Sequence, residues 1–210
     1  MYYGKYPDAM RKQLGNRLPK FTAEEVALVK GSNDFFGINS YGDNYIKHRE
    51  GEPPLDDFYG HLEVLDQNKA GEWIGPETES TWLRPNPRGF RSLLNWLSKR
   101  YGSPTFYVTE NGTSVKGETD LPREEILNDE FRCWFFRGYI GALADAHTID
   151  GIDIRGYTGW SLLEYVNFSR SVLSRSRTML SFVRFASYLR ELVPETIATG
   201  RLDVVDIPNS

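Results

Sequence analysis

The sequence has few residues that could join distant segments through a disulfide or a metal ion. It contains one cysteine, Cys133, and three histidines among 210 residues. A single cysteine excludes an internal disulfide framework and fits a reducing compartment. The histidines, His48, His61 and His147, lie far apart in the sequence, and none of them has zinc-ligand spacing to the cysteine. The composition therefore gives no indication of a metal centre.

An excess of basic residues and long apolar runs are also missing. The chain has 25 Lys and Arg against 29 Asp and Glu, a formal net charge of −4, which argues against nucleic acid as a partner. No apolar run is long enough to span a bilayer, and residues 1–7 lack the apolar core of a signal peptide. We therefore expect a cytoplasmic protein with no membrane or nucleic-acid partner.

The 210 residues, 40% of them hydrophobic, are enough for one domain with a sizeable core. Three segments have the composition of buried strands: residues 34–41, 105–109 and 152–160. A capping box at Thr22–Glu25 predicts a short helix, and apolar residues at helical spacing from Phe90 to Tyr101 predict a second helix. Strands that alternate with helices predict parallel strands joined by helical crossovers.

Two longer segments have a less regular pattern. Residues 42–87 are rich in Gly, Pro, Asp and Glu with little periodicity, and we predict a long excursion, of the kind that often carries function. Residues 121–146 predict one long helix. Its expected core positions are Leu127, Phe131, Trp134, Phe135 and Leu143.

The most informative stretch is Tyr107-Val108-Thr109-Glu110-Asn111-Gly112. It places a carboxylate, Glu110, at the end of a predicted buried strand, and Asn111-Gly112 predicts a turn directly after it. Barrels of α/β type place their catalytic groups at this end of the strands. Glu110 is therefore the first candidate for a catalytic residue, although an ordinary strand-end carboxylate would look the same.

Five segments, in order, resemble the C-terminal half of fungal-type β-glucosidases of glycoside hydrolase family 1. They are residues 6–10 with 18–22, then 34–41, 82–90, 107–112 and 156–163. The resemblance implies an α/β fold, a partial (β/α)8 TIM barrel with about strands 6–8 and their helices. A complete barrel typically needs about 250 residues. We expect residues 1–168 to form this half barrel.

The resemblance also implies roles for individual residues. Glu110 matches the family's nucleophile, and Tyr41 the tyrosine that holds it by a hydrogen bond. Asn39 would contact the sugar, Trp160 would stack on its ring, and Trp82 would line the aglycone side. The implied substrate is a small β-glucoside or cello-oligosaccharide, hydrolysed with retention. The family implies no metal or organic cofactor.

One catalytic carboxylate of the family has no counterpart in the sequence. Retaining glycosidases use a pair of carboxylates, and in this family the acid/base lies in an Asn-Glu-Pro motif on the fourth strand. These 210 residues contain no Asn-Glu-Pro. We therefore expect a β-glucosidase fragment that is poorly active or inactive alone, with self-association through exposed barrel edges. The alternatives are a non-catalytic module that binds sugar or protein, and an unstable product.

The composition changes after residue 168. Between Ser169 and Arg190 there are five arginines, six serines and no acidic residue, and lysine is absent after Lys116. We predict that residues 169–210 form a separate Arg/Ser-rich tail. A loosely ordered or non-native segment is the favoured interpretation, and a basic amphipathic helix that binds a membrane surface or a partner helix is the alternative.

Overall fold

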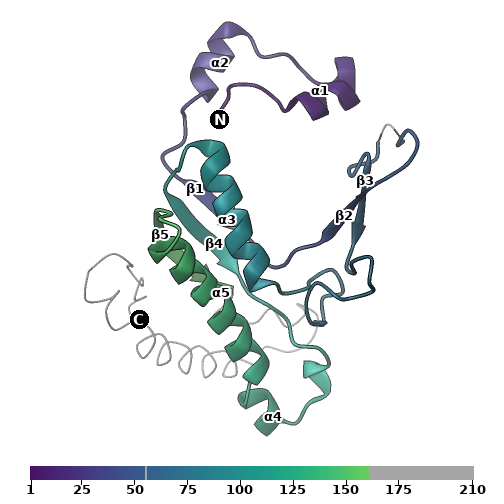
Figure 1. Cartoon of the computed structure of the whole chain (residues 1–210), viewed down its shortest axis with the longest axis vertical. Coiled ribbons are helices and arrows are strands. Elements are labelled where there is room, and N and C mark those ends of the chain that lie inside the picture. The colour runs from purple at the N-terminus through teal and green to yellow at the C-terminus, as the bar shows by residue number, and fades with distance from the viewer. Residues whose placement is uncertain (55, 161–210) are drawn as a thin grey trace, which may run out of the picture.

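The computed structural model describes residues 1–54 and 56–160, and its body is a parallel sheet with two helices (Figure 1). The strands are β1 (Phe36–Asn39), β4 (Phe106–Asn111) and β5 (Ile154–Gly159), in the order β1-β4-β5. Both pairings are parallel, as the alternation of strands and helices predicts. The crossovers contain the long helices α3 (Pro87–Tyr101) and α5 (Glu130–Thr148).

The core lies between the sheet and these two helices. Side chains alternate along β4, so that Phe106 and Val108 are buried while Tyr107 is exposed. The buried side chains belong to one cluster with Leu94 of α3 and Phe135 of α5. The predicted apolar face of α3 is confirmed: Phe90, Leu94 and Leu97 are buried, and Leu93 and Tyr101 pack against the cluster.

The opposite face of the sheet is not covered by any described helix. Phe35 is 50% exposed and Tyr107 is 36% exposed, and their rings contact each other edge to face. Parallel sheets are normally covered on both faces. The described residues therefore form an open layer of sheet and helices rather than a closed barrel.

The helices of the N-terminal segment form an arm that stands away from the sheet (Figure 1), while the Tyr2 ring packs against Phe36 of β1 and Tyr101 of α3. The arm contains α1 (Asp8–Leu14), the 3-10 turn η1 (Gly15–Arg17) and α2 (Ala23–Val29), none of which has a buried residue. The predicted capping box begins α2: the Glu25 amide donates to Thr22 Oγ1 at 3.2 Å, and the Thr22 amide donates to Glu25 Oε2 at 2.8 Å.

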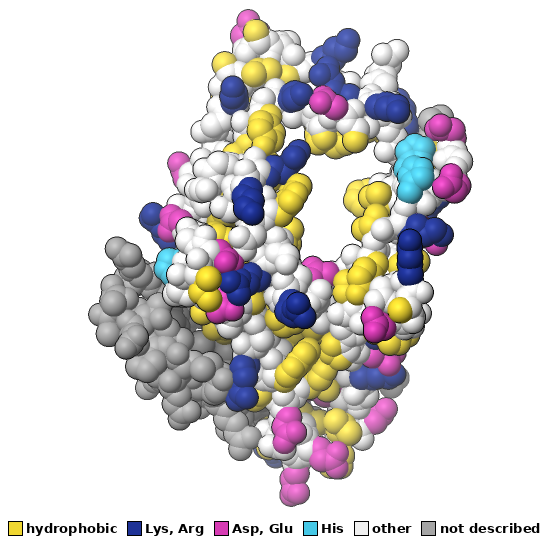
Figure 2. All heavy atoms as spheres, viewed as in Figure 1, with side chains coloured by type: hydrophobic (Ala, Val, Ile, Leu, Met, Phe, Trp, Pro, Cys, Tyr) yellow, Lys and Arg dark blue, Asp and Glu magenta, His cyan; other side chains and the backbone are white. Residues whose placement is uncertain are grey.

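The excursion predicted over residues 42–87 contains regular structure that its sequence pattern does not indicate. This segment contains a hairpin of β2 (Tyr45–His48) and β3 (Leu62–Leu65), which pair antiparallel. Each strand has only four residues, and neither has a buried residue, so no clean alternation marks them. Figure 2 shows an opening bordered by the arm, the hairpin and the body, with hydrophobic side chains around its rim.

The single helix predicted over residues 121–146 is wrong. The chain forms the 3-10 turn η2 (Glu118–Asp120), then α4 (Arg123–Leu127), and then α5. Asp129 starts α5 anew, because its side chain accepts from the Arg132 amide at 2.9 Å as an N-cap.

The core positions predicted for this stretch are only partly correct. Phe135 and Leu143 are buried and Leu127 and Phe131 are half-buried, but Trp134 is 44% exposed and packs against the Phe131 ring instead. The proposed tail, residues 169–210, and the part of the 156–163 segment after Trp160 lie outside the described residues. In the described ranges, no helix is both long and apolar enough to cross a bilayer.

Candidate active site

The candidate site lies where the parallel strands β1 and β4 end. Asn39 is the register partner of Glu110, after an irregularity in the pairing between Ile38 and Asn39. The pairing continues one residue further, since the Ser40 amide donates to the Glu110 carbonyl at 3.0 Å. Glu110 therefore stands at the carboxyl edge of the sheet, where barrel enzymes carry their chemistry.

Tyr41 holds the Glu110 carboxylate. Its hydroxyl donates to Glu110 Oε2 at 2.6 Å, and both side chains are half-buried. Burial, and then the hydrogen bond to Glu110, raise the pKa of the Tyr41 phenol well above its usual value. Tyr41 therefore stays protonated at neutral pH and remains a donor. The hydrogen bond is the one that the family resemblance implies.

Asn111 ties the three strands together beside Glu110. It is fully buried, and its Nδ2 donates to the Ser40 carbonyl of the β1 end at 2.6 Å. Its Oδ1 accepts from the Tyr157 hydroxyl of β5 at 2.7 Å, and its carbonyl accepts from the Trp160 amide at 2.7 Å. Sequence reasoning missed this role, because Asn before Gly predicts a turn. The strand in fact continues through Asn111.

A second residue that the sequence did not reveal is Tyr139 of α5. Its hydroxyl donates to the Tyr41 carbonyl at 3.1 Å and accepts from the Asn86 amide at 3.0 Å. Asn86 in turn is the N-cap of α3, because its Oδ1 accepts from the Gly89 amide at 3.1 Å. Both helices thus fix the backbone of Tyr41. In the sequence, Tyr139 is one of many apolar positions of α5, and no signal separates it from the others.

The other three predicted site residues, Asn39, Trp82 and Trp160, differ in what they contact and in how exposed they are. Asn39 Oδ1 accepts from Thr109 Oγ1 at 2.6 Å in an exposed position. Trp82 is 65% exposed, and its ring lies edge-on to Tyr41 with centroids 6.1 Å apart. Trp160 is 50% exposed and is bonded through its amide to the residue after Glu110.

The arrangement can present one carboxylate to a substrate. Glu110 has one oxygen occupied by a phenol donor, and polar and aromatic side chains lie on the neighbouring strand ends. Throughout the described part of the chain, no group of three or more His, Cys, Asp or Glu side chains could hold a metal ion. The chemistry that these residues can support is that of a nucleophilic or basic carboxylate.

The comparisons with known proteins all point to one family. The family model described as glycosyl hydrolase family 1 matches residues 1–192, which runs past residue 168. A relative named beta-glucosidase 1B, from Phanerodontia chrysosporium, is 44% identical over 175 residues, 83% of this chain and 32% of the relative. Beta-glucosidase 4 from Oryza sativa subsp. japonica is 37% identical, over 83% of this chain and 36% of the relative.

Solved structures give the same result. A family 1 β-glucosidase of the fungus Humicola insolens, in complex with glucose, is 65% identical with a TM-score of 0.75, over 77% of this chain and 34% of that one. Beta-glucosidase 2 of Trichoderma reesei, in complex with Tris, is 57% identical with a TM-score of 0.75, over 78% of this chain and 35% of that one. The chain thus spans about a third of the length of the relatives that it matches. These relatives do not favour the alternative of a non-catalytic module.

Proposed function

The chain belongs to glycosyl hydrolase family 1, and on that premise we propose that it supplies the nucleophile side of a retaining β-glucosidase site, with Glu110 as the nucleophile. The observation that carries the proposal is the 2.6 Å hydrogen bond from the Tyr41 hydroxyl to Glu110 Oε2. A charge-assisted bond of this kind stabilises the carboxylate and fixes its orientation. With Oε2 occupied by Tyr41, Oε1 is the oxygen that attacks.

The reaction proceeds in two displacements. Glu110 Oε1 attacks the anomeric carbon while the bond to the leaving oxygen breaks, and a second carboxyl group protonates that oxygen. The resulting glucosyl ester on Glu110 is then hydrolysed by water, which the second carboxylate deprotonates, and the sugar leaves with its configuration retained. These 210 residues do not contain the Asn-Glu-Pro motif in which this family carries the second group.

The proposed substrates are small β-glucosides and cello-oligosaccharides. The exposed ring of Trp160 offers an apolar face for stacking on a sugar, and the exposed Asn39 offers hydrogen bonds to sugar hydroxyls. Trp82, in contact with Tyr41, would line the aglycone side. The Humicola insolens structure holds glucose, which supports a glucose-sized sugar as the bound group.

The test is to trap the glucosyl ester with 2-deoxy-2-fluoro-β-glucosyl fluoride. Fluoride leaves without being protonated, so the trap needs only the nucleophile. We expect mass spectrometry of the 210-residue chain to find the fluoroglucosyl group on the peptide that contains Glu110, and to find none in Glu110→Gln. A label on a different carboxylate, or an undiminished label in Glu110→Gln, would contradict the proposal.

Tyr41→Phe tests the supporting hydrogen bond in the same assay. Losing a hydrogen bond to a charged group costs about 1.5–3 kcal/mol, so we expect labelling to slow by about ten- to a hundredfold. Labelling at the original rate would show that Tyr41 does not hold the nucleophile. A chimera that carries residues 34–160 in place of the matching segment of a fungal relative adds turnover as a second readout, which Glu110→Gln should abolish.

A further inference from the structure

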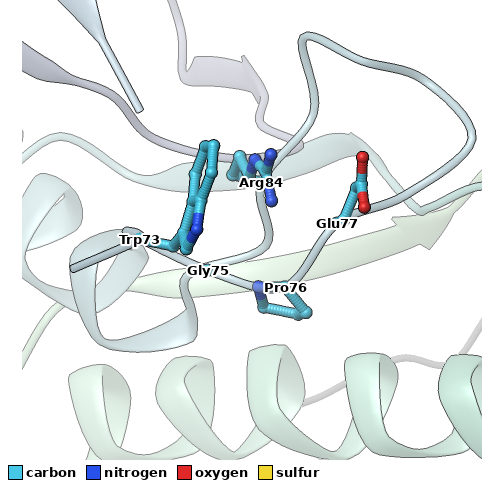
Figure 3. Close-up of a pocket in the computed structure, with 5 residues that line it drawn as sticks. All are labelled: Trp73, Gly75, Pro76, Glu77 and Arg84. Atoms are coloured by element: carbon cyan, nitrogen blue, oxygen red, sulfur yellow. The ribbon is translucent and has the colours of Figure 1, made fainter. Parts of the chain in front are cut away.

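A pocket apart from Glu110 lies in the excursion between β3 and α3 (Figure 3). It has a volume of ≈ 590 Å³ and is lined by Trp73, Gly75, Pro76, Glu77 and Arg84. We call it the Arg84 pocket. It is a shallow hollow that is open to solvent, so a ligand would lie against its wall and would not be enclosed. None of its lining residues belongs to the site proposed for the β-glucosidase reaction.

Arg84 is the unusual residue of this pocket. Its side chain and backbone together are only 8% exposed, and its guanidinium carbon lies 4.0 Å from the centroid of the Trp73 ring. Figure 3 shows the two side chains alongside each other, with Glu77 standing apart. Among residues 1–54 and 56–160, no carboxylate forms an ion pair with Arg84 and no acceptor takes a hydrogen bond from its guanidinium. The guanidinium nitrogens of Arg84 are not among the described side-chain atoms that lack both solvent contact and a hydrogen-bond partner, so they are accessible from the pocket.

The backbone of the pocket is held in place by close contacts. The chain at Gly75 passes so near the following segment that a Cβ there would lie 2.0 Å from the Pro85 carbonyl oxygen. The Asp43 amide donates to the Arg84 carbonyl at 3.4 Å, which joins the pocket to the segment after Tyr41. The position of Arg84 is therefore fixed by main-chain packing and does not depend on a ligand.

The charges around the pocket leave the Arg84 guanidinium available to pair with a ligand. Glu77, the one carboxylate among the lining residues, forms an ion pair with Lys116. Lys116 is the main cause that lowers the pKa of Glu77, and Arg84 makes only the smallest contribution. The charge of Glu77 is thus balanced by Lys116, and the positive charge of Arg84 is left for a ligand.

We propose that the Arg84 pocket binds a small ring-bearing organic anion, whose carboxylate or phosphate pairs with the Arg84 guanidinium. The planar fork of arginine suits both of these groups, because it can donate two parallel hydrogen bonds. The ring of the ligand would lie against Trp73, which is 55% exposed. An inorganic ion would pair with Arg84 but leave most of the pocket volume unfilled. The proposal does not depend on Glu110.

The experiment is calorimetric titration of the 210-residue chain with benzoate, phenyl phosphate, benzyl alcohol and inorganic phosphate. We expect at least one of the two aryl anions to bind at least tenfold more tightly than benzyl alcohol and inorganic phosphate. Tighter phenyl phosphate identifies a phosphate ligand, and tighter benzoate a carboxylate. Binding of neither anion, or equal binding of benzyl alcohol, overturns the proposal. Glu110→Gln should bind as the parent does, which separates this site from the glycosidase site.

Variants assign the binding to Arg84. We expect Arg84→Gln to weaken the binding at least tenfold, while Arg88→Gln, an exposed arginine four residues later, leaves it unchanged. Because Arg84 is buried, Arg84→Gln could also disturb the fold, so a variant of the exposed Glu77 side chain provides a second test. Glu77→Gln removes a negative charge from the pocket rim, so binding should become about two- to fivefold tighter. Unchanged affinity in Arg84→Gln, or weaker affinity in Glu77→Gln, would contradict the assignment.

Discussion

At the residue scale, Gly112 determines how closely the ends of β4 and β5 approach each other. A Cβ on Gly112 would lie 1.7 Å from the Trp160 carbonyl oxygen, a separation that no side chain can tolerate without movement of the backbone. Asn111, the residue before it, binds the Trp160 amide. The close approach thus keeps Trp160 beside the strand end that carries Glu110.

We expect Gly112→Ala to destabilise the chain. Overpacking typically costs about 1–3 kcal/mol, and here the obstacle is backbone, which moves at a greater cost. Gly141→Ala is the matched control, because Gly141 lies exposed in α5 and a Cβ added there would have nothing within 4 Å. Gly141→Ala should stabilise the helix by up to about 1 kcal/mol. Urea unfolding, monitored by circular dichroism, measures the free energy of unfolding of both variants. Equal stability of Gly112→Ala and the parent would refute the prediction.

The sequence singles out candidate site residues where a local pattern or the family resemblance marks them. Glu110 follows a run of β-branched and aromatic residues, and Tyr41 is identified by the family resemblance. Asn111 and Tyr139 carry no such pattern. Their contacts lie 46 to 98 positions away in the sequence, so only the folded chain reveals them.

At the element scale, Arg91 fastens α3 to the end of α5. Its Nε and Nη2 donate to the two Asp150 oxygens at 2.7 and 2.8 Å, and its Nη1 donates to Asp145 at 2.8 Å. Asn95 adds a hydrogen bond of 2.6 Å to Asp150. The Arg91 bonds, followed by that of Asn95, lower the pKa of Asp150 to about 2.

This link should lose strength in acid. In the unfolded chain Asp150 has its ordinary pKa of about 3.9, so between that pH and about 2 the unfolded state binds more protons than the folded state. The contribution of Asp150 to stability is therefore present above about pH 4 and is lost as the pH falls to 2. Urea titrations at several pH values should show a shallower acid slope for Asp150→Asn. Asp120→Asn, an exposed aspartate of η2, should keep the parental slope, and an equal change in both variants would contradict the prediction.

Elements are predicted from the sequence where their periodicity is long enough. The apolar face of α3 repeats over four turns, and the capping box of α2 is a local hydrogen-bond pattern. The β2–β3 hairpin is missed because each strand spans four residues without a buried side. The break between α4 and α5 is missed because apolar residues lie on both sides of the short polar stretch Asn128–Glu130, and the cap at Asp129 shows where the new helix begins.

At the scale of the whole molecule, the described part of the chain leaves the sheet with open edges and an open face. Of the described strands, only β4 has a partner on both sides, so β1 and β5 each present an unpaired edge. Phe35 and Tyr107 are exposed on the uncovered face. Unpaired edges and exposed apolar surface favour association with a second chain.

We expect the 210-residue chain to associate with itself. Size-exclusion chromatography with light scattering should give an average mass that rises with protein concentration, and Phe35→Lys should reduce that rise because it places a charge on the uncovered face. Lys47→Glu serves as the control. It also changes the charge of a side chain, but its site is on the hairpin, away from the uncovered face. A monomer at every concentration would contradict this prediction.

We also expect the 210-residue chain alone to hydrolyse aryl β-glucosides very slowly or not at all. Glu110 is the proposed nucleophile, but the chain has no Asn-Glu-Pro motif to supply the group that protonates the leaving oxygen and later activates water. Release of nitrophenol from an aryl β-glucoside measures this. Measurable turnover that disappears in Glu110→Gln would contradict this prediction, because it would show that the chain alone can both form and hydrolyse the glucosyl ester.

The hydrogen bonds of Asn111 also set an order of events during protein synthesis. Tyr157, whose hydroxyl donates to the Asn111 side chain, follows Asn111 by 46 residues in the sequence. Trp160, whose amide donates to the Asn111 carbonyl, comes after Tyr157. When Glu110 leaves the ribosome, neither of these neighbours has been made. The carboxylate reaches its final surroundings only after α5 and β5 have been translated and have docked. The surroundings of Glu110 are thus completed long after its own codon has been read.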